Sequence, residues 1–167
     1  VFGVIQPIYF SPSNLLDILD QSVINGLLAI GMTLVIITAG IDLTVGSTLA
    51  IVIVSVGNFL VMGLNPFAAV LAGAAIGFGL GLVNGILVAK MKLQPFVATL
   101  GMMSVYRGVA YLITGGWPVL NIPQNFRDIM DGDVIGTLSS SMILFRVVTV
   151  AAYILLKHTK FGTYLYS

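Results

Sequence analysis

The longest uncharged stretch of this chain most constrains its fold. Residues 43–89 form 47 consecutive positions without a charged side chain, and Lys90 and Lys92 follow directly. A helix rises 1.5 Å per residue, so a hydrocarbon core of about 30 Å takes about 20 residues. The stretch is therefore too long for one membrane span and suits two, which divide at Asn65-Pro66. The sequence predicts a protein whose main solvent is lipid.

Composition and missing motifs exclude several classes of protein. The chain is 58% hydrophobic and 8% charged, whereas soluble domains are about 25% charged. Seven basic against six acidic side chains leave no strong field, so nucleic acid is not an expected partner. With no cysteine and one histidine, we expect neither a disulfide nor a metal site. The chain has no phosphate-binding loop and no hydrolase motif, so we expect no enzymatic activity of its own.

The charge-free runs predict an all-α fold, a polytopic transmembrane helical bundle. Pro95 suits the first turn of a helix, and Gly115-Gly116 interrupts one. The chain is interpreted as a single transmembrane domain over residues 1–167, with an outer loop at 115–137. Five spans are expected, at 22–40, 44–64, 67–89, 96–114 and 138–156.

The lysines predict the orientation of these spans. Threading the spans alternately through the membrane brings four lysines to one side and the 115–137 loop to the other. Because cytoplasmic loops carry an excess of Lys and Arg, the lysine side is predicted to be cytoplasmic. The four are Lys90, Lys92, Lys157 and Lys160.

Glycines recur every four residues along the third expected span, at Gly73, Gly77, Gly81 and Gly85. A face without side chains lets another helix approach closely, and such faces commonly serve as helix interfaces in membranes. Alternatively, the stripe lines a pore in which Asn84 is the polar group.

Asp42 lies between two expected spans, within Gly40-Ile41-Asp42. Aspartate is among the best residues for capping a helix N-terminus, and its charge suits the positive end of the helix dipole. The capping interpretation competes with a role in gating or coupling, in which Asp42 contacts Lys90 or a cytoplasmic partner.

Arg107 lies 11 residues beyond Phe96, which is about 16 Å along a helix and therefore deep in the membrane. Arg146 is similarly deep. Burying such a charge costs about 2.5–3.5 kcal/mol on insertion scales, so both should face protein or water. Arg107 either snorkels toward the outer face or belongs to a structural pair or a pathway lining.

Neutral polar side chains in or beside the apolar spans suit a neutral, hydroxylated solute better than an ion. Hydrogen bonds between helices explain the same residues equally well. These residues are Asn58, Asn84, Gln94 and Thr99.

Several short runs, in their order, resemble a known family. They are GIDLTVGS at 40–47, NGILVAK at 84–90, QPFVATLG at 94–101, YRG at 106–108 and TKFG at 159–162. Together they resemble the permease subunit of ribose-type simple-sugar ABC importers, in the binding-protein-dependent transport system inner membrane component family. The related branched-chain amino acid permeases differ at the first run, which favours a sugar.

The resemblance implies part of a type II-like ABC importer permease in the bacterial cytoplasmic (inner) membrane. It implies a second permease copy or paralogue, cytoplasmic ATPase subunits that hold ATP and Mg²⁺, and an extracytoplasmic sugar-binding protein. The chain itself would bind no cofactor. The residues that match family motifs become candidates for translocation or coupling: Asp42, Asn84, Gln94, Thr99 and Arg107.

The resemblance covers nearly all of this chain but only about the N-terminal half of such a permease. The family's first span and its second half are expected to lie outside the chain, and Thr163 stands where the family usually has arginine. Two alternatives stay open. One is a truncated remnant that transports nothing, and the other is an ion-coupled secondary transporter, which would need a half-repeat or a membrane-embedded carboxylate pair.

Overall fold

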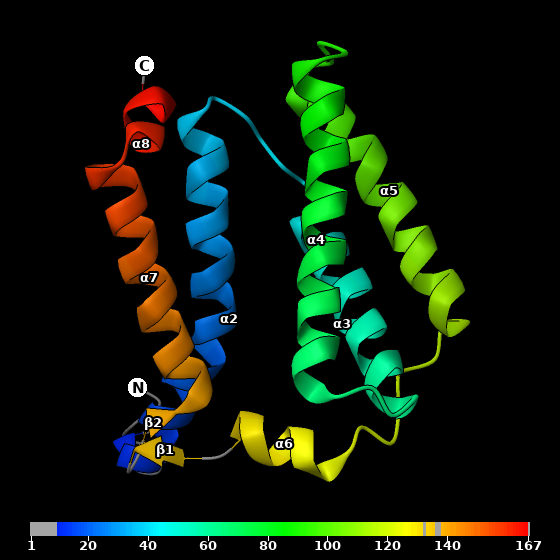
Figure 1. Ribbon diagram of the computed structural model, residues 1–167, viewed down its shortest axis with the longest axis vertical. Coiled ribbons are helices and arrows are strands. Elements are labelled where there is room, and N and C mark those ends of the chain that lie inside the picture. The colour runs from blue at the N-terminus through cyan, green and yellow to red at the C-terminus, as the bar shows by residue number, and fades with distance from the viewer. Residues whose placement is uncertain (1–9, 132, 136–137, 167) are drawn as a thin grey trace. The chain divides into compact units, whose positions relative to one another are not determined.

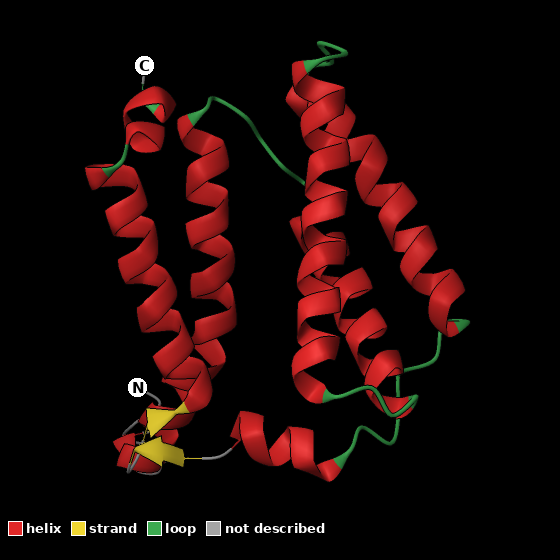
Figure 2. Cartoon of the chain, in the orientation of Figure 1, coloured by secondary structure: helices red, strands yellow, loops and turns green. Residues whose placement is uncertain are grey.

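The structure, a computed structural model, describes residues 10–131, 133–135 and 138–166. These residues are mostly helical (Figures 1 and 2), which confirms the all-α fold class. Two compact units are formed. One combines the residues up to Thr38 with those from Arg127 onward, and the other is Ala39–Phe126. The single domain expected over residues 1–167 stays a prediction.

The first unit is built on helix α2, Pro12–Ile37. Ser11 caps it by accepting a hydrogen bond from the Asn14 amide at 3.3 Å, and Pro12 occupies the first turn. The helix thus begins ten residues before the expected span 22–40 and ends three residues earlier. The helix extends beyond the expected span because a Ser-Pro start with a polar first turn continues it through Asp17 and Asp20.

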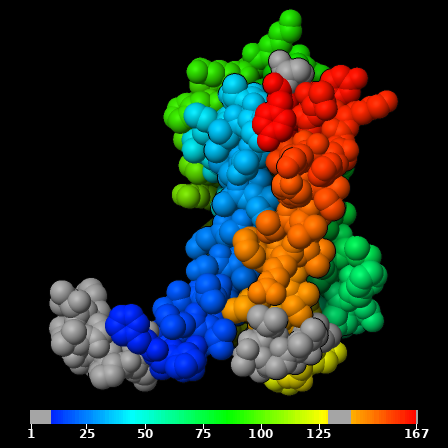
Figure 3. Space-filling view, turned by 90° about the vertical axis from the view of Figure 1, so that its left-hand side faces the viewer, coloured from blue at the N-terminus to red at the C-terminus, as the bar shows by residue number. Residues whose placement is uncertain are grey.

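Helix α7, Ser140–His158, lies beside α2 (Figures 1 and 3). It replaces the expected span 138–156 with a shift of two residues, because the Ser139 side chain caps it. The two helices meet closely at Gly26, where an added Cβ would lie 2.6 Å from the Phe145 ring. A short helix, α8 (Lys160–Leu165), follows and is capped by Thr159.

The second unit contains three longer helices: α3 (Val45–Val61), α4 (Pro66–Ala89) and α5 (Pro95–Thr114). Prolines at the first turns of α4 and α5 set their starts, and Asn65 also caps α4. Helix α5 ends at Gly115, which has a φ of 62° and adopts the left-handed conformation that favours glycine. Helix α3 contacts both α4 and α5, and its Ile51 and Leu60 are buried.

Helix α3 is shorter than the span expected at 44–64. Its 17 residues extend about 26 Å, at the lower limit for crossing a bilayer. The helix cannot continue to residue 64 because Gly63 has a φ of 87° and the Asn65-Pro66 start of α4 follows. The helix therefore ends three residues before the end of the expected span.

The region expected as the outer loop 115–137 contains regular structure. It includes a short helix, α6 (Gln124–Asp131), and strand β1 (Asp133–Ile135). Strand β1 pairs antiparallel with β2 (Leu138–Ser139), with an irregular register. These elements escaped the sequence analysis because α6 is polar and each strand is shorter than a readable alternation of apolar residues.

Most apolar side chains of the described residues point outward. Phe67, Phe78 and Leu112 are each more than 70% exposed, and no described residue of α7 is buried. Among the described residues, four helices are long and apolar enough to cross a membrane: α2, α4, α5 and α7. An apolar surface of this extent suits a lipid environment or further protein.

Candidate functional site

The turn before α3 is held by the carboxylate of Asp42. Its Oδ1 accepts one hydrogen bond from the Thr44 amide at 2.8 Å and one from the Thr44 hydroxyl at 2.6 Å. Asp42 therefore bonds to the residue that precedes the first helical position, Val45, and not to the amides of α3 itself. The sequence placed Asp42 at this helix start, and the structure defines which groups it binds.

Thr44 connects this turn to α4. Its hydroxyl donates to Asp42 and accepts a hydrogen bond of 2.7 Å from the Nδ2 of Asn84, a residue 40 positions later in the chain. Thr44 is 1% exposed and Asn84 is 6% exposed. A buried amide with no partner is costly, so the Asn84 side chain keeps this bond and ties the turn to α4.

Tyr106 extends the connection to α5. Its hydroxyl lies 2.9 Å from the Leu80 carbonyl oxygen and 3.2 Å from the Oδ1 of Asn84, two acceptors that share its one proton. Its ring is 3% exposed. One side chain of α5 therefore reaches two positions of α4, one turn apart.

Thr99 forms a second tie between the turn and α5. Its hydroxyl is 3.0 Å from the Ile41 carbonyl oxygen and 2.8 Å from the Pro95 carbonyl oxygen. Thr99 is buried, and its 58-residue separation from Ile41 makes the contact a tertiary one. The turn is thus held on one side by α4 and on the other by α5.

These contacts define what we call the turn network. Among the described residues, no buried side-chain nitrogen or oxygen lacks a hydrogen-bond partner. The network consists of neutral groups and one carboxylate, joined to one another and to the backbone by hydrogen bonds. Its members are Asp42, Thr44, Asn84, Thr99 and Tyr106.

The structure does not bring all five candidate residues together. Asp42, Asn84 and Thr99 belong to the turn network, whereas Gln94 and Arg107 are exposed. Gln94 is the residue before α5 and makes no side-chain cap bond there. Arg107 follows Tyr106 on α5, so its side chain leaves the helix about 100° away from the network. Their roles in translocation or coupling stay predictions.

The two halves of the glycine stripe of α4 have different neighbours. At Gly73 an added Cβ would overlap the Val56 side chain of α3, and at Gly77 it would lie 3.4 Å from Val52. No atom lies within 4 Å of such a Cβ at Gly81 or Gly85. The first half of the stripe therefore packs against α3, and the second half is open in the described part of the chain.

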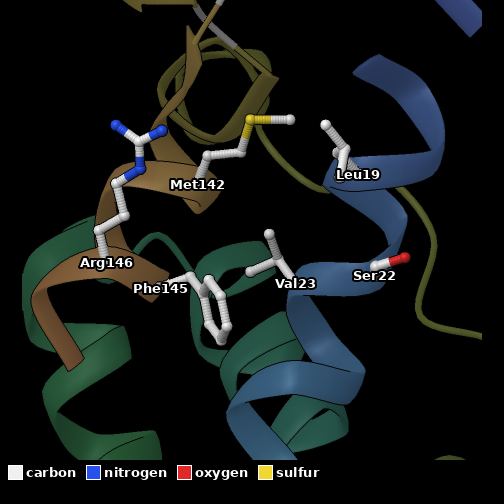
Figure 4. Close-up of a pocket in the computed structure, with 6 residues that line it drawn as sticks. All are labelled: Leu19, Ser22, Val23, Met142, Phe145 and Arg146. Carbon is white, nitrogen blue, oxygen red and sulfur yellow. The ribbon is translucent and has the colours of Figure 1, made fainter. Parts of the chain in front are cut away.

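The first unit has its own cavity, of about 300 Å³, between α2 and α7 (Figure 4). Met142 extends toward Leu19, and the Phe145 ring lies beside Val23 (Figure 4). Nearby, the Asp20 carboxylate accepts hydrogen bonds from the hydroxyls of Ser139 and Ser141, which ties α2 to the start of α7. The lining residues are Leu19, Ser22, Val23, Met142, Phe145 and Arg146.

The sequence analysis missed two members of the turn network, Thr44 and Tyr106. Both lie inside the short runs quoted above, at 40–47 and 106–108, so the runs were the available signal. What the sequence did not indicate is that the two residues meet at Asn84. No cluster of three or more His, Asp or Glu side chains that fits a metal ion occurs in the described ranges.

Comparison with known proteins gives the chain's relationships. The model of the family described as branched-chain amino acid transport system, permease component, matches residues 14–167. The chain is similar to the ribose import permease proteins of Escherichia coli, 37% identical, and of Bacillus subtilis, 38% identical. Each alignment covers 100% of this chain, with 53% of the first relative and 52% of the second.

A more distant relative has a different named substrate. The autoinducer 2 import system permease protein of Yersinia enterocolitica is 34% identical over 100% of this chain and 46% of its own length. The chain spans about half the length of the curated relatives it matches. No solved structure matches the chain.

Proposed function

The chain belongs to the family of branched-chain amino acid transport system permease components, and within it we propose a sugar importer, because the chain is similar along its whole length to ribose import permeases. In this proposal the chain forms part of the permease of an ATP-driven importer for a simple sugar such as ribose. It is a multi-pass protein of the inner membrane, as its relatives and its four apolar helices indicate. Its relatives are transport permease components.

The observation that carries the proposal is the similarity to ribose import permeases along the whole chain. The site supports it in a second way. The runs that suggested a sugar permease supply all five members of the turn network, including contacts between residues 40 and 58 positions apart. Four of the five runs therefore correspond to one folded feature of the second unit, and the fifth, TKFG, lies in the first unit.

In the proposed importer, this chain provides the membrane-embedded part and binds no cofactor. ATP and Mg²⁺ belong to separate cytoplasmic ATPase subunits, so ATP hydrolysis is not an activity of this chain. An extracytoplasmic sugar-binding protein delivers the solute, and a second permease copy or paralogue completes the pathway. The solute is released readily, because a pathway must bind weakly enough to let its cargo leave.

Uptake measurements test the proposal in the cell that makes the protein. Deleting the gene should abolish most high-affinity uptake of radiolabelled ribose, and restoring the gene should recover it. ATP depletion should stop the uptake, whereas a protonophore applied with ATP held constant should leave it nearly unchanged. D-Allose and autoinducer 2 should be measured in parallel, because relatives are named for them.

Two results would replace the proposal with its alternatives. Uptake that continues after ATP depletion but stops with the protonophore would indicate an ion-coupled transporter. Unchanged uptake of all three solutes after deletion, together with failure to co-purify with any ATPase subunit, would indicate a remnant that transports nothing.

A further inference from the structure

The polar atoms at the centre of the turn network are all committed to protein partners. The Thr44 hydroxyl donates to Asp42 and accepts from Asn84, and the Asn84 Oδ1 accepts from Tyr106. Thr44, Asn84 and Tyr106 are buried, and Asp42 is half-buried. A passing solute would have to break these bonds to be recognised by them.

The direction of every bond follows from Asp42. A carboxylate only accepts, so the Thr44 proton must point to Asp42. The Thr44 oxygen is then left as an acceptor, and Asn84 must turn its NH₂ group toward it. This orientation aims the Asn84 carbonyl oxygen at Tyr106, whose one proton is shared between this oxygen and the Leu80 carbonyl oxygen. The hydroxyl of Tyr106 therefore holds the amide of Asn84 from α5, opposite the bond that Asn84 makes to Thr44.

On this basis we propose that Tyr106 is a positioning residue for translocation, which locks the turn before α3 to α4 and α5 and does not contact the solute. The inference rests on the proposed function of the chain as part of a permease. It assigns Thr44 and Asn84 the same role and removes Asn84 from the residues that line the pathway.

The consequence concerns movement of the turn. Thr99 holds the Ile41 carbonyl from α5, and Asn84 holds Thr44 from α4, so a displacement of the turn must carry both helices with it. Without the Tyr106 contact, the side chain of Asn84 is held only by its bond to Thr44, so the turn and α4 are coupled less tightly to α5. We expect fewer productive transport cycles and an unchanged affinity for the solute.

The test uses Tyr106→Phe in the full-length protein in its own membrane, with Tyr111→Phe as the matched control. Both changes remove one hydroxyl from α5, but Tyr111 is 64% exposed and lies outside the network. For Tyr106→Phe we expect a three- to tenfold lower maximal rate of ATP-dependent uptake and a KM within about twofold of the original. The range follows from a net hydrogen-bond contribution that corresponds to about that factor.

Hydrogen exchange gives a readout that does not require transport. In purified protein, Tyr106→Phe should raise amide exchange of residues 42–44 about three- to tenfold, and Tyr111→Phe should not. Thr44→Val should also lower the maximal uptake rate and raise amide exchange at residues 42–44. Combined with Tyr106→Phe it should add little, because each change removes one of the two hydrogen bonds that hold the Asn84 side chain. Thr44→Ser keeps the hydroxyl and should retain the original exchange and uptake.

A raised KM with an unchanged maximal rate would overturn the inference, since it would indicate that Tyr106 contacts the solute. Exchange at residues 42–44 that does not respond to Tyr106→Phe or Thr44→Val would overturn it as well. If the unmodified protein shows no ATP-dependent uptake, the proposed function fails, and the positioning role in transport falls with it. The exchange measurement would then test only whether Tyr106 stabilises the turn through Asn84.

Discussion

Gly162 is buried at the junction of α7 and α8, within the TKFG run. An added Cβ at this position would overlap the carbonyl oxygen of Leu156, which is backbone and cannot rotate away. Thr159 caps α8 by accepting a hydrogen bond from the Gly162 amide. The glycine is therefore required here for the close approach of two backbone segments.

We expect Gly162→Ala to lower the free energy of unfolding by about 1–3 kcal/mol, because the extra methyl group forces the backbone at the junction to shift. The control is Gly31→Ala in α2, where no atom lies within 4 Å of an added Cβ. There, alanine should be neutral or stabilise by up to about 1 kcal/mol. Thermal unfolding in detergent measures both, and equal stability of the two variants would contradict the expectation.

Asn84 allows a second prediction at the scale of single residues. Replacing Asn84 with leucine removes the donor to Thr44 and one acceptor of Tyr106, inside the protein. We expect the free energy of unfolding to fall by about 1–3 kcal/mol, which is the cost of leaving a buried polar group without its partner. Gln94→Leu, at an exposed position, should change stability by less than about 0.5 kcal/mol. Chemical unfolding in detergent compares the two variants. An Asn84→Leu variant as stable as the original protein would contradict a stabilising role for Asn84 in the turn network.

At the scale of helices, the glycine stripe of α4 gives a graded interface with α3. The stripe was interpreted either as a packing face or as a pore lining. Gly73 and Gly77 contact the valines of α3, which supports packing for that half. Val52 and Val56 are β-branched and hold one preferred rotamer in a helix, so they cannot easily move aside.

The series Gly73→Ala, Gly77→Ala and Gly81→Ala tests this gradient. Gly73→Ala should destabilise the protein by about 1–3 kcal/mol, since its methyl group overlaps Val56. Gly77→Ala makes an ordinary contact with Val52, and Gly81→Ala meets nothing within 4 Å, so both should be near neutral. Melting temperatures in one detergent rank the variants. A lower melting temperature for Gly81→Ala than for Gly73→Ala would contradict the expectation and indicate that the open half makes the more important contact.

At the scale of the whole molecule, the membrane orientation is still a prediction from the lysines. It can be measured by labelling an introduced thiol, because residues 1–167 contain no cysteine of their own. Helix α5 is long enough to cross the membrane, and Lys92 and Trp117 lie just beyond its two ends.

In intact cells, Trp117→Cys should react with a membrane-impermeant maleimide, and Lys92→Cys should react only after the cells are opened. The expectation follows from the excess of lysine on the cytoplasmic side. The reverse labelling pattern would invert the topology and place the GIDLTVGS turn outside, away from any cytoplasmic ATPase. Labelling of denatured samples confirms that both thiols are present.

The sequence by itself determined the membrane class, the helical fold and the starts of α4 and α5. The physical reason is that these features are local: a membrane span needs about 20 predominantly apolar residues in a row, and proline and glycine set helix ends through their own backbone. The motif order also indicated the family that the later comparison found. Hydropathy alone does not indicate capping residues or polar turns. The sequence analysis therefore missed the early start of α2, the short length of α3 and the small elements near residues 124–139.

Only the tertiary structure decided which polar residues meet. The sequence singled out Asp42, Asn84 and Thr99 separately. The packing of the three helices adds Thr44, which joins Asp42 to Asn84, and Tyr106, which joins Asn84 to α5. Helical periodicity indicates the face of a helix on which a residue lies but not the partner that this face meets. Contacts across 22 to 58 residues depend on how helices associate, and that is a property of the packed unit.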